Sequence, residues 1–106
     1  MRSFTGHQVL RRLQHGEPIR VIDVREPNEF AAGHIPGAEL IPIGEIPTVI
    51  YRLRTDEEVV FVCRSGARSQ RVCEFLASKG FSQVATLKGG MLQWPGRVER
   101  SIGSAN

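Results

Sequence analysis

One short segment constrains the fold more than any other part of the chain: a β-rich run, Glu58 to Val62, that ends directly at Cys63. Its β-branched and aromatic residues predict a buried strand. The next segment, Ala67 to Ser78, carries apolar side chains at helical spacing, and Gly80 ends that pattern. We therefore expect a strand, a tight loop and a helix to meet at this cysteine.

Strand-like and helix-like segments alternate along the rest of the chain. Thr5 followed by Gln8 has the form of a capping box and predicts a helix over Gly6 to His15. The other expected elements are strands over Ile19–Val24, Glu39–Pro42 and Gln83–Leu87, a brief helix through Phe30, and a helix over Gly44–Leu53. Such alternation predicts an α/β domain with a mostly parallel sheet and helices on both faces.

Length and composition fit one packed domain. Of the 106 residues, 41% are hydrophobic and 24% are charged, so we expect residues 1–106 to form a single domain with a flexible tail over 96–106. No apolar run approaches the roughly 18 residues that cross a bilayer, and the N-terminal sequence lacks the pattern of a signal peptide. We therefore expect a cytoplasmic protein with no membrane partner.

The net charge of +3 comes almost wholly from arginines that are scattered among acidic residues. A nucleic-acid surface needs a basic cluster with stacking aromatic residues or a recognisable motif, and the sequence shows neither. We expect no nucleic-acid partner. The local exception is a group of arginines that closely follows Cys63, namely Arg64, Arg68 and Arg71.

Two cysteines, Cys63 and Cys73, raise the question of redox state. Because no export signal is recognised, we expect both thiols to be reduced, with Cys73 a buried structural thiol on its helix; a resolving role for Cys73 stays open. In parallel sheets ligands bind beyond the carboxyl ends of the strands, where Asp23 and Cys63 both lie. We expect Asp23 to pair with Arg25 and to support this edge, since a carboxylate there needs a partner.

The residues after Cys63 are suited to holding a sulfur anion. A turn that opens a helix exposes unpaired backbone N–H groups and the positive end of the helix dipole, which lower a thiol pKa. Gly66 lets the backbone curl inward, and the hydroxyls of Ser65 and Ser69 add donors. A lone cysteine after a strand is often only a small buried hydrophobe, but a core cysteine does not need such neighbours. We expect Cys63 to be a nucleophile.

Four segments of the chain form a recognisable set: Cys63-Arg64-Ser65-Gly66-Ala67-Arg68 followed by Ser69, Asp23-Val24-Arg25-Glu26, Gly33-His34-Ile35-Pro36-Gly37-Ala38, and Gly89-Gly90 before Trp94. Together they closely resemble the corresponding segments of single-domain rhodaneses. The resemblance runs from about Phe4 to Pro95 with the segments in the right order. It implies a rhodanese-like domain with a central, mostly parallel five-stranded sheet and helices on both faces.

The resemblance also implies a reaction. The Cys63 thiolate would attack the outer sulfur of thiosulfate, sulfite would leave, and the resulting persulfide would pass its sulfur to cyanide or a thiol. Another persulfide donor in place of thiosulfate stays open. The implied substrate-binding residues are Arg64, Ser65, Gly66, Ala67, Arg68 and Ser69. No metal or organic cofactor is implied, and thioredoxin or another sulfur-carrier protein is a candidate acceptor.

Two other functions stay open at the level of sequence. A rhodanese-like module that only binds partners would keep the fold, although such modules often lack the cysteine that this chain has. A cysteine phosphatase or arsenate reductase holds its thiolate in a similar loop, but its signature has five residues between Cys and Arg. In this chain four residues lie between Cys63 and Arg68. The shorter loop favours a single sulfur atom over a tetrahedral phosphate.

Overall fold

A computed structural model describes residues 2–101, in which one sheet of five parallel strands has the order β1-β5-β4-β2-β3. The strands are β1 (Arg2–Phe4), β2 (Arg20–Asp23), β3 (Glu39–Leu40), β4 (Val59–Val62) and β5 (Val84–Leu87). The helices are α1 (Gly6–Gln14), α2 (Pro27–Ala32), α3 (Ile46–Val49) and α4 (Ala67–Ser78), with 3₁₀ turns η1 (Ile43–Glu45), η2 (Ile50–Arg52) and η3 (Gly90–Gln93). The expected five-stranded α/β fold is confirmed.

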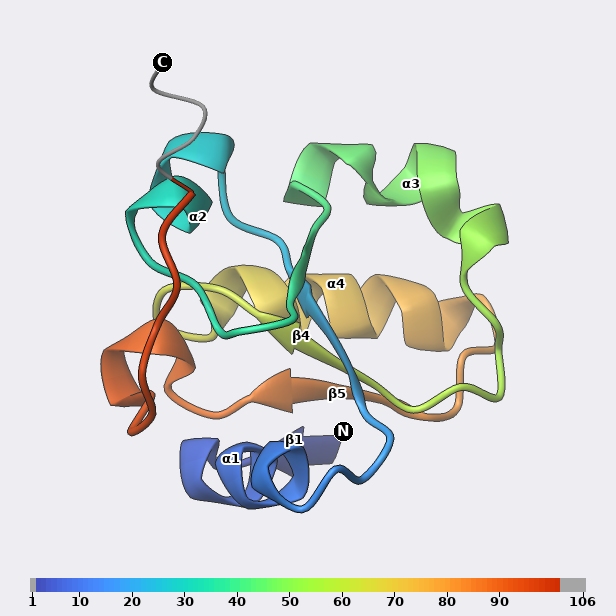
Figure 1. Ribbon diagram of the computed structural model, residues 1–106. Coiled ribbons are helices and arrows are strands. Elements are labelled where there is room, and N and C mark those ends of the chain that lie inside the picture. Colours follow the sequence, from blue (N-terminus) through green and yellow to red (C-terminus); the bar gives the residue numbers. More distant parts are fainter. Residues whose placement is uncertain (1, 102–106) are drawn as a thin grey trace.

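The sheet divides the core into two layers. Figure 1 shows α3 and α4 on one side of the strands and α1 on the other. The side chains of β4 point alternately to the two faces of the sheet. Val59 and Phe61 pack on the α4 side, whereas Val60 and Val62 pack on the side of α1 and η3. All four are almost completely buried, as expected for the middle strand of a parallel sheet covered on both faces.

Strand register brings the candidate site residues to one edge. Asp23 at the end of β2 lies beside Val62 at the end of β4, and the Val24 N–H donates to the Val62 carbonyl at 2.8 Å. Cys63 follows at once, so it lies next to the point where β2 ends. The expectation that Asp23 and Cys63 share one edge of the sheet is thereby met.

Local sequence signals set several element boundaries. Thr5 Oγ1 accepts the Gln8 N–H at 3.1 Å while Gln8 Oε1 accepts the Thr5 N–H at 2.8 Å, which is the capping box expected at the start of α1. Helix α4 begins at Ala67 and ends at Ser78, as its apolar spacing predicts. It covers β4 and β5, and the loop at Cys63 leads directly into its first turn.

The structure differs from the single helix expected over residues 44–53. That segment forms η1, the four-residue α3 and η2, so it is helical but broken. Pro47 has no N–H to donate to Ile43, and the Thr48 hydroxyl bonds back to the Glu45 carbonyl at 2.8 Å. Both features favour short turns over one regular helix.

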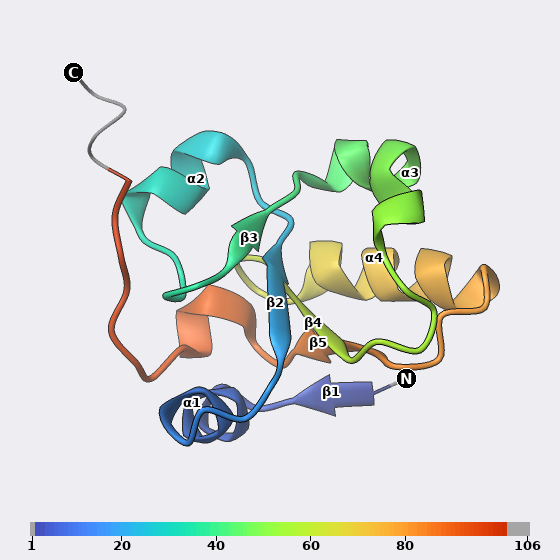
Figure 2. The same cartoon turned by 45° about the vertical axis from the view of Figure 1, so that its right-hand side comes forward.

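The sequence analysis does not place β1. Its three residues, Arg2–Phe4, have no β-branched run, and they form a strand because β5 offers a free edge, where Phe4 lies beside Leu87. The segment expected to be a flexible tail is hydrogen-bonded in its first part: His34 and Glu99 form an antiparallel bridge, and the Ser101 N–H donates to the Ala31 carbonyl at 3.1 Å. Figure 2 shows this part of the chain passing beside α2. Residues 102–106 of the expected tail lie outside the described part.

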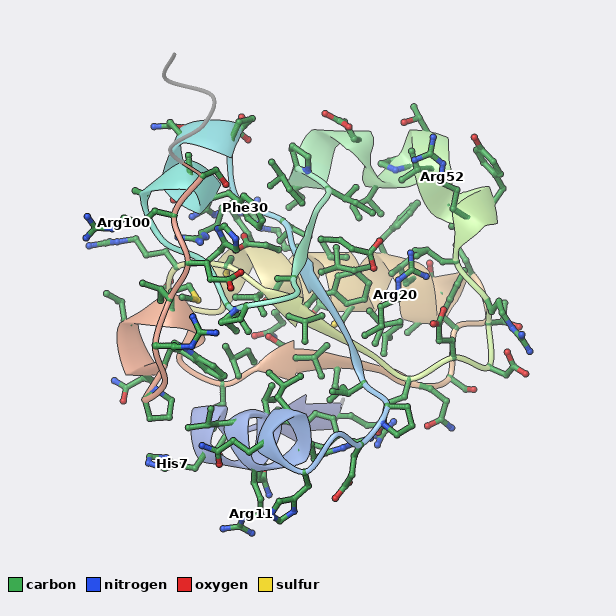
Figure 3. All side chains as sticks on the ribbon, in the orientation of Figure 1. His7, Arg11, Arg20, Phe30, Arg52 and Arg100 are labelled. Carbon is green, nitrogen blue, oxygen red and sulfur yellow. The ribbon has the colours of Figure 1, made fainter. Side chains whose placement is uncertain are left out.

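Arginines are spread around the surface. Figure 3 shows Arg11 on α1, Arg52 on η2 and Arg100 near the C-terminal end on different sides of the protein. All three are exposed.

None of the helices within residues 2–101 has the length and apolar character needed to span a bilayer.

Candidate active site

The loop after β4 wraps around the sulfur of Cys63. The Gly66 N–H donates to Cys63 Sγ at 3.0 Å and the Ser69 N–H donates to it at 3.4 Å. Gly66 makes this curvature possible with φ of +109°, a left-handed conformation that a residue with a side chain adopts only with strain. The loop therefore turns backbone donors toward a side chain that is only 1% exposed.

Opposing effects act on the pKa of Cys63. Burial by itself raises the pKa, because a charged sulfur loses hydration. Hydrogen bonds from the Ser69 N–H and hydroxyl and from the N–H groups of Gly66 and Arg68 lower it, and together they outweigh burial. The net result is a pKa below the usual thiol value of 9.0, which favours the thiolate, the nucleophilic form of cysteine.

The outer wall of the loop is fixed by η3. The Met91 N–H donates to the Cys63 carbonyl at 2.9 Å and the Leu92 N–H donates to the Arg64 carbonyl at 3.0 Å. Gly90, with φ of +60°, lies so close that a Cβ atom there would overlap both carbonyl groups. The Gly89-Gly90 pair thus allows η3 to press against the loop and to hold it.

The arginines of the loop lie in different environments. Arg68 donates from both terminal nitrogens to the carboxylate of Glu29 on α2, at 2.7 and 3.0 Å. Arg64 is exposed, and no ion pair involves its guanidinium among residues 2–101. Of these two arginines, Arg64 is therefore the one without an ion pair within residues 2–101.

Glu29 is held in its charged form by this contact. The hydrogen bonds from Arg68 lower the pKa of Glu29 to about 2, against a smaller opposing effect of burial, and the Glu26 N–H also donates to Glu29 at 2.9 Å. The ion pair links α2 to the first turn of α4. The contact is bidentate, so it fixes the relative orientation of the Arg68 and Glu29 side chains as well as the distance between them.

The remaining residues of the loop differ in how far they are buried. Ser65 and Ala67 are exposed, so their side chains do not reach the buried sulfur. Ser69 is fully buried, and its Oγ lies 3.6 Å from Cys63 Sγ. Within the predicted set, the structure therefore brings Gly66, Ser69 and the backbone N–H of Arg68 to the sulfur atom.

Asp23 and Arg25 form a buried ion pair beside the loop. Arg25 Nη2 lies 2.8 Å from Asp23 Oδ2, Nε also donates to the carboxylate, and Nη2 donates to the Gly33 carbonyl at 2.8 Å. Both side chains are at least 92% buried. The pair ties the end of β2 to the loop after α2, which is a supporting arrangement.

Cys73 and His34 lie in settings that do not suit catalysis. Burial raises the pKa of Cys73 to about 12, and the nearby charge of Glu74 adds to this, so its thiol stays protonated at neutral pH. His34 bonds through Nδ1 to the Phe30 carbonyl at 2.8 Å, and its ring stacks on that of Phe30. Both cysteines are free.

Two residues at the site were not singled out from the sequence. Glu29 reaches Arg68 only because α2 and α4 meet at this edge of the sheet, and Thr86 of β5 reaches Ser69 because β5 lies beneath the first turn of α4. The sequence shows the acidic residue in the first turn of α2, but it does not show that its partner is Arg68.

Within residues 2–101 no cluster of three or more His, Cys, Asp or Glu side chains is arranged to bind a metal.

Comparison with known proteins identifies the family. The family model of the rhodanese-like domain matches residues 5–96. The YtwF protein of Bacillus subtilis is 43% identical over 88 residues, which cover 83% of this chain and 84% of that protein. A thiosulfate sulfurtransferase, GlpE of Pseudomonas fluorescens, is 34% identical over 98 residues, covering 88% of this chain and 90% of the relative.

The similarity extends to three dimensions. The crystal structure of a rhodanese-like domain protein from Staphylococcus aureus superposes with a TM-score of 0.87 and 34% identity, covering 95% of this chain and 99% of the other. The residues that the family model matches, 5–96, contain β2 to β5, the loop at Cys63 and the Gly89-Gly90 pair. The chain belongs to the rhodanese-like domain family.

Proposed function

We propose that this rhodanese-like domain is a sulfurtransferase that carries sulfur as a persulfide on Cys63, with thiosulfate as a donor and cyanide or a thiol as the acceptor. Relatives named as sulfurtransferases support the general activity. One observation carries the assignment to Cys63: the N–H groups of Gly66 and Ser69 both point at its sulfur. A cysteine that served packing alone would not need them.

The first half-reaction loads the enzyme. The Cys63 thiolate attacks the outer sulfur of thiosulfate, an S–S bond forms at Cys63, and the S–S bond of thiosulfate breaks. Sulfite leaves with the electron pair of the broken bond, so the step needs no oxidant. The loop N–H groups stabilise the thiolate before the attack and polarise the sulfur afterwards.

The second half-reaction returns the free thiolate. A nucleophile, cyanide or the thiolate of an acceptor, attacks the outer sulfur of the persulfide, and Cys63 leaves as a thiolate. The same hydrogen bonds that lower the pKa of Cys63 make it a good leaving group. The same N–H donors around Cys63 therefore serve both half-reactions.

No general base is needed for either step. Attack by a thiolate on a sulfane sulfur transfers no proton, because the nucleophile is already ionised. This agrees with the surroundings of His34, which is 93% buried, stacked on Phe30 and bonded to its carbonyl. We assign His34 to the support of the loop after α2.

Arg64 is the residue that we assign to donor binding by charge. Its guanidinium is exposed beside the loop, whereas that of Arg68 is held by Glu29. A sulfonate group accepts charge-assisted hydrogen bonds from an arginine, and a dianionic donor is also attracted over a longer range. Arg68 contributes its backbone N–H to the sulfur and shapes the loop through Glu29.

Steady-state transfer from thiosulfate to cyanide, glutathione and thioredoxin tests the proposed function. Cys63→Ala is the blank, and Cys73→Ser is the matched control because it changes the other cysteine of the chain. We expect turnover in the wild type and in Cys73→Ser but not in Cys63→Ala. Equal rates in wild type and Cys63→Ala would contradict the proposal, and the acceptor with the highest kcat/KM would identify the preferred class of acceptor.

A further inference from the structure

The hydroxyl of Ser69 lies among more hydrogen-bonding partners than its single proton can serve. Ser69 Oγ lies 2.6 Å from Thr86 Oγ1, 3.1 Å from the Gly66 carbonyl oxygen and 3.6 Å from Cys63 Sγ. The residue is fully buried. A serine hydroxyl has one proton to donate and two lone pairs to accept, so the direction of that proton depends on its neighbours.

The Gly66 carbonyl does not depend on the Ser69 proton. It already accepts the Gln70 N–H at 3.0 Å, as part of the first turn of α4. A thiolate at Cys63 has no proton and can only accept. The arrangement that gives the thiolate a donor is therefore one in which Ser69 donates to Cys63 Sγ and accepts from Thr86.

Thr86 is placed to act as that donor. It lies on β5, between β1 and β4 in the sheet, and its backbone is paired with Ser3 on one side and Phe61 on the other. A β-branched residue in a paired strand has few side-chain rotamers, so the position of its hydroxyl oxygen is well defined. Val84, two residues earlier on the same face, is a core residue, which shows that an apolar side chain suits this layer.

We propose that Thr86 is a positioning residue: its hydroxyl donates to Ser69 Oγ and thereby directs the Ser69 proton to Cys63 Sγ. The inference rests on the proposed role of Cys63 as a nucleophile. Within residues 2–101 no hydrogen bond joins Thr86 to the sulfur, so Thr86 acts through Ser69. Its effect should therefore disappear when Ser69 has no hydroxyl.

The test is the pH dependence of Cys63 alkylation by iodoacetamide, followed peptide by peptide with mass spectrometry. Only the thiolate reacts, so the midpoint of the rate profile reports the pKa of Cys63 without any sulfur transfer. In Thr86→Val, which replaces the hydroxyl by a methyl group, we expect the midpoint to rise by about 0.5 to 1 pH unit. This is the shift that loss of one hydrogen bond of typical strength produces.

Two further variants separate the hydroxyl from other effects. Thr86→Ser keeps the hydroxyl and should bring the midpoint back toward the wild-type value. Ser69→Ala should raise the midpoint, and adding Thr86→Val to it should change nothing more, since the intermediary is absent. Thr86→Ala carries the same test if thermal unfolding shows that Thr86→Val does not fold.

An unshifted midpoint in folded Thr86→Val or Thr86→Ala would overturn the inference. So would an equal shift in Thr86→Val and Thr86→Ser, or a further shift when Thr86→Val is added to Ser69→Ala. These outcomes are distinct from failure of the proposed function. A Thr86-dependent midpoint together with a wild-type protein that transfers no sulfur would uphold the inference and reject only the sulfurtransferase assignment.

Discussion

Arg68 and Glu29 join the cysteine loop to α2 through two parallel hydrogen bonds of 2.7 and 3.0 Å. The contact engages the terminal nitrogens of an arginine that, from the sequence, was expected to bind the substrate. It leaves Arg64 as the loop arginine without an ion pair among the described residues. The loop therefore has one arginine held in an ion pair, Arg68, and one exposed arginine, Arg64.

Replacing Glu29 by glutamine should strengthen donor binding. Glu29→Gln removes one negative charge beside the loop and weakens the hold on Arg68, so a dianionic donor meets a more positive site. We expect the KM for thiosulfate to fall about fivefold at low salt, since such an attraction is worth roughly 1 kcal/mol in water. The difference should shrink as salt is added. An unchanged or higher KM would show that Arg68 does not limit donor binding.

The same pair should stabilise the fold in a pH-dependent way. Glu29 has a pKa of about 2 in the folded protein against an ordinary 4.5, so its contribution is complete above about pH 4.5 and is lost as pH falls toward 2. Because the pair is partly exposed, we expect wild type to exceed Glu29→Gln by only about 1 kcal/mol in unfolding free energy at pH 7. Urea unfolding at pH 7, 4 and 3 measures the difference. A gap that widens toward low pH would contradict the assignment.

Arg64 should govern capture of the donor. In Arg64→Ala we expect kcat/KM for thiosulfate to fall about tenfold, mainly through KM, because one charge-assisted contact to the sulfonate is lost. Arg11→Ala is the matched control, since Arg11 is an exposed arginine on α1, on the far side of the sheet from α4. Equal effects of the two substitutions would indicate that only overall charge matters.

Gly90 should be essential to the shape of the loop. Gly90→Ala introduces a Cβ against the carbonyls of Cys63 and Arg64, at a residue with positive φ, and we expect a loss of at least about 2 kcal/mol in unfolding free energy. Gly44→Ala is the control, because nothing lies within 4 Å of its added Cβ. Urea unfolding of both variants measures the effect. A Gly90→Ala protein as stable as Gly44→Ala would mean that η3 does not hold the loop.

Sequence patterns predicted those parts of the fold that depend on local signals. The capping box of α1, the bounds of α4 and the strand that ends at Cys63 follow from spacing and residue type. β1 could not be found in this way, because it forms only by pairing with a strand more than eighty residues away along the chain. The broken helix over residues 43–52 depends on how one proline and one threonine hydroxyl are accommodated.

The candidate site shows the same division. Cys63, Gly66 and Ser69 follow from the local order of strand, loop and helix, and the structure brings them together. Glu29 and Thr86 approach the loop from other elements, so only the packing of α2 and β5 around α4 reveals them. The residues whose N–H groups donate to the Cys63 sulfur lie in one segment of the sequence, whereas Glu29 and Thr86 lie in other segments.

The most direct measurement of the central claim is the intact mass of the desalted protein after exposure to thiosulfate. We predict a gain of one sulfur atom per chain that dithiothreitol removes, located by peptide mapping on Cys63, present in Cys73→Ser and absent in Cys63→Ala. An unchanged wild-type mass, or a sulfur that maps to Cys73, would contradict the account of Cys63 as the persulfide carrier.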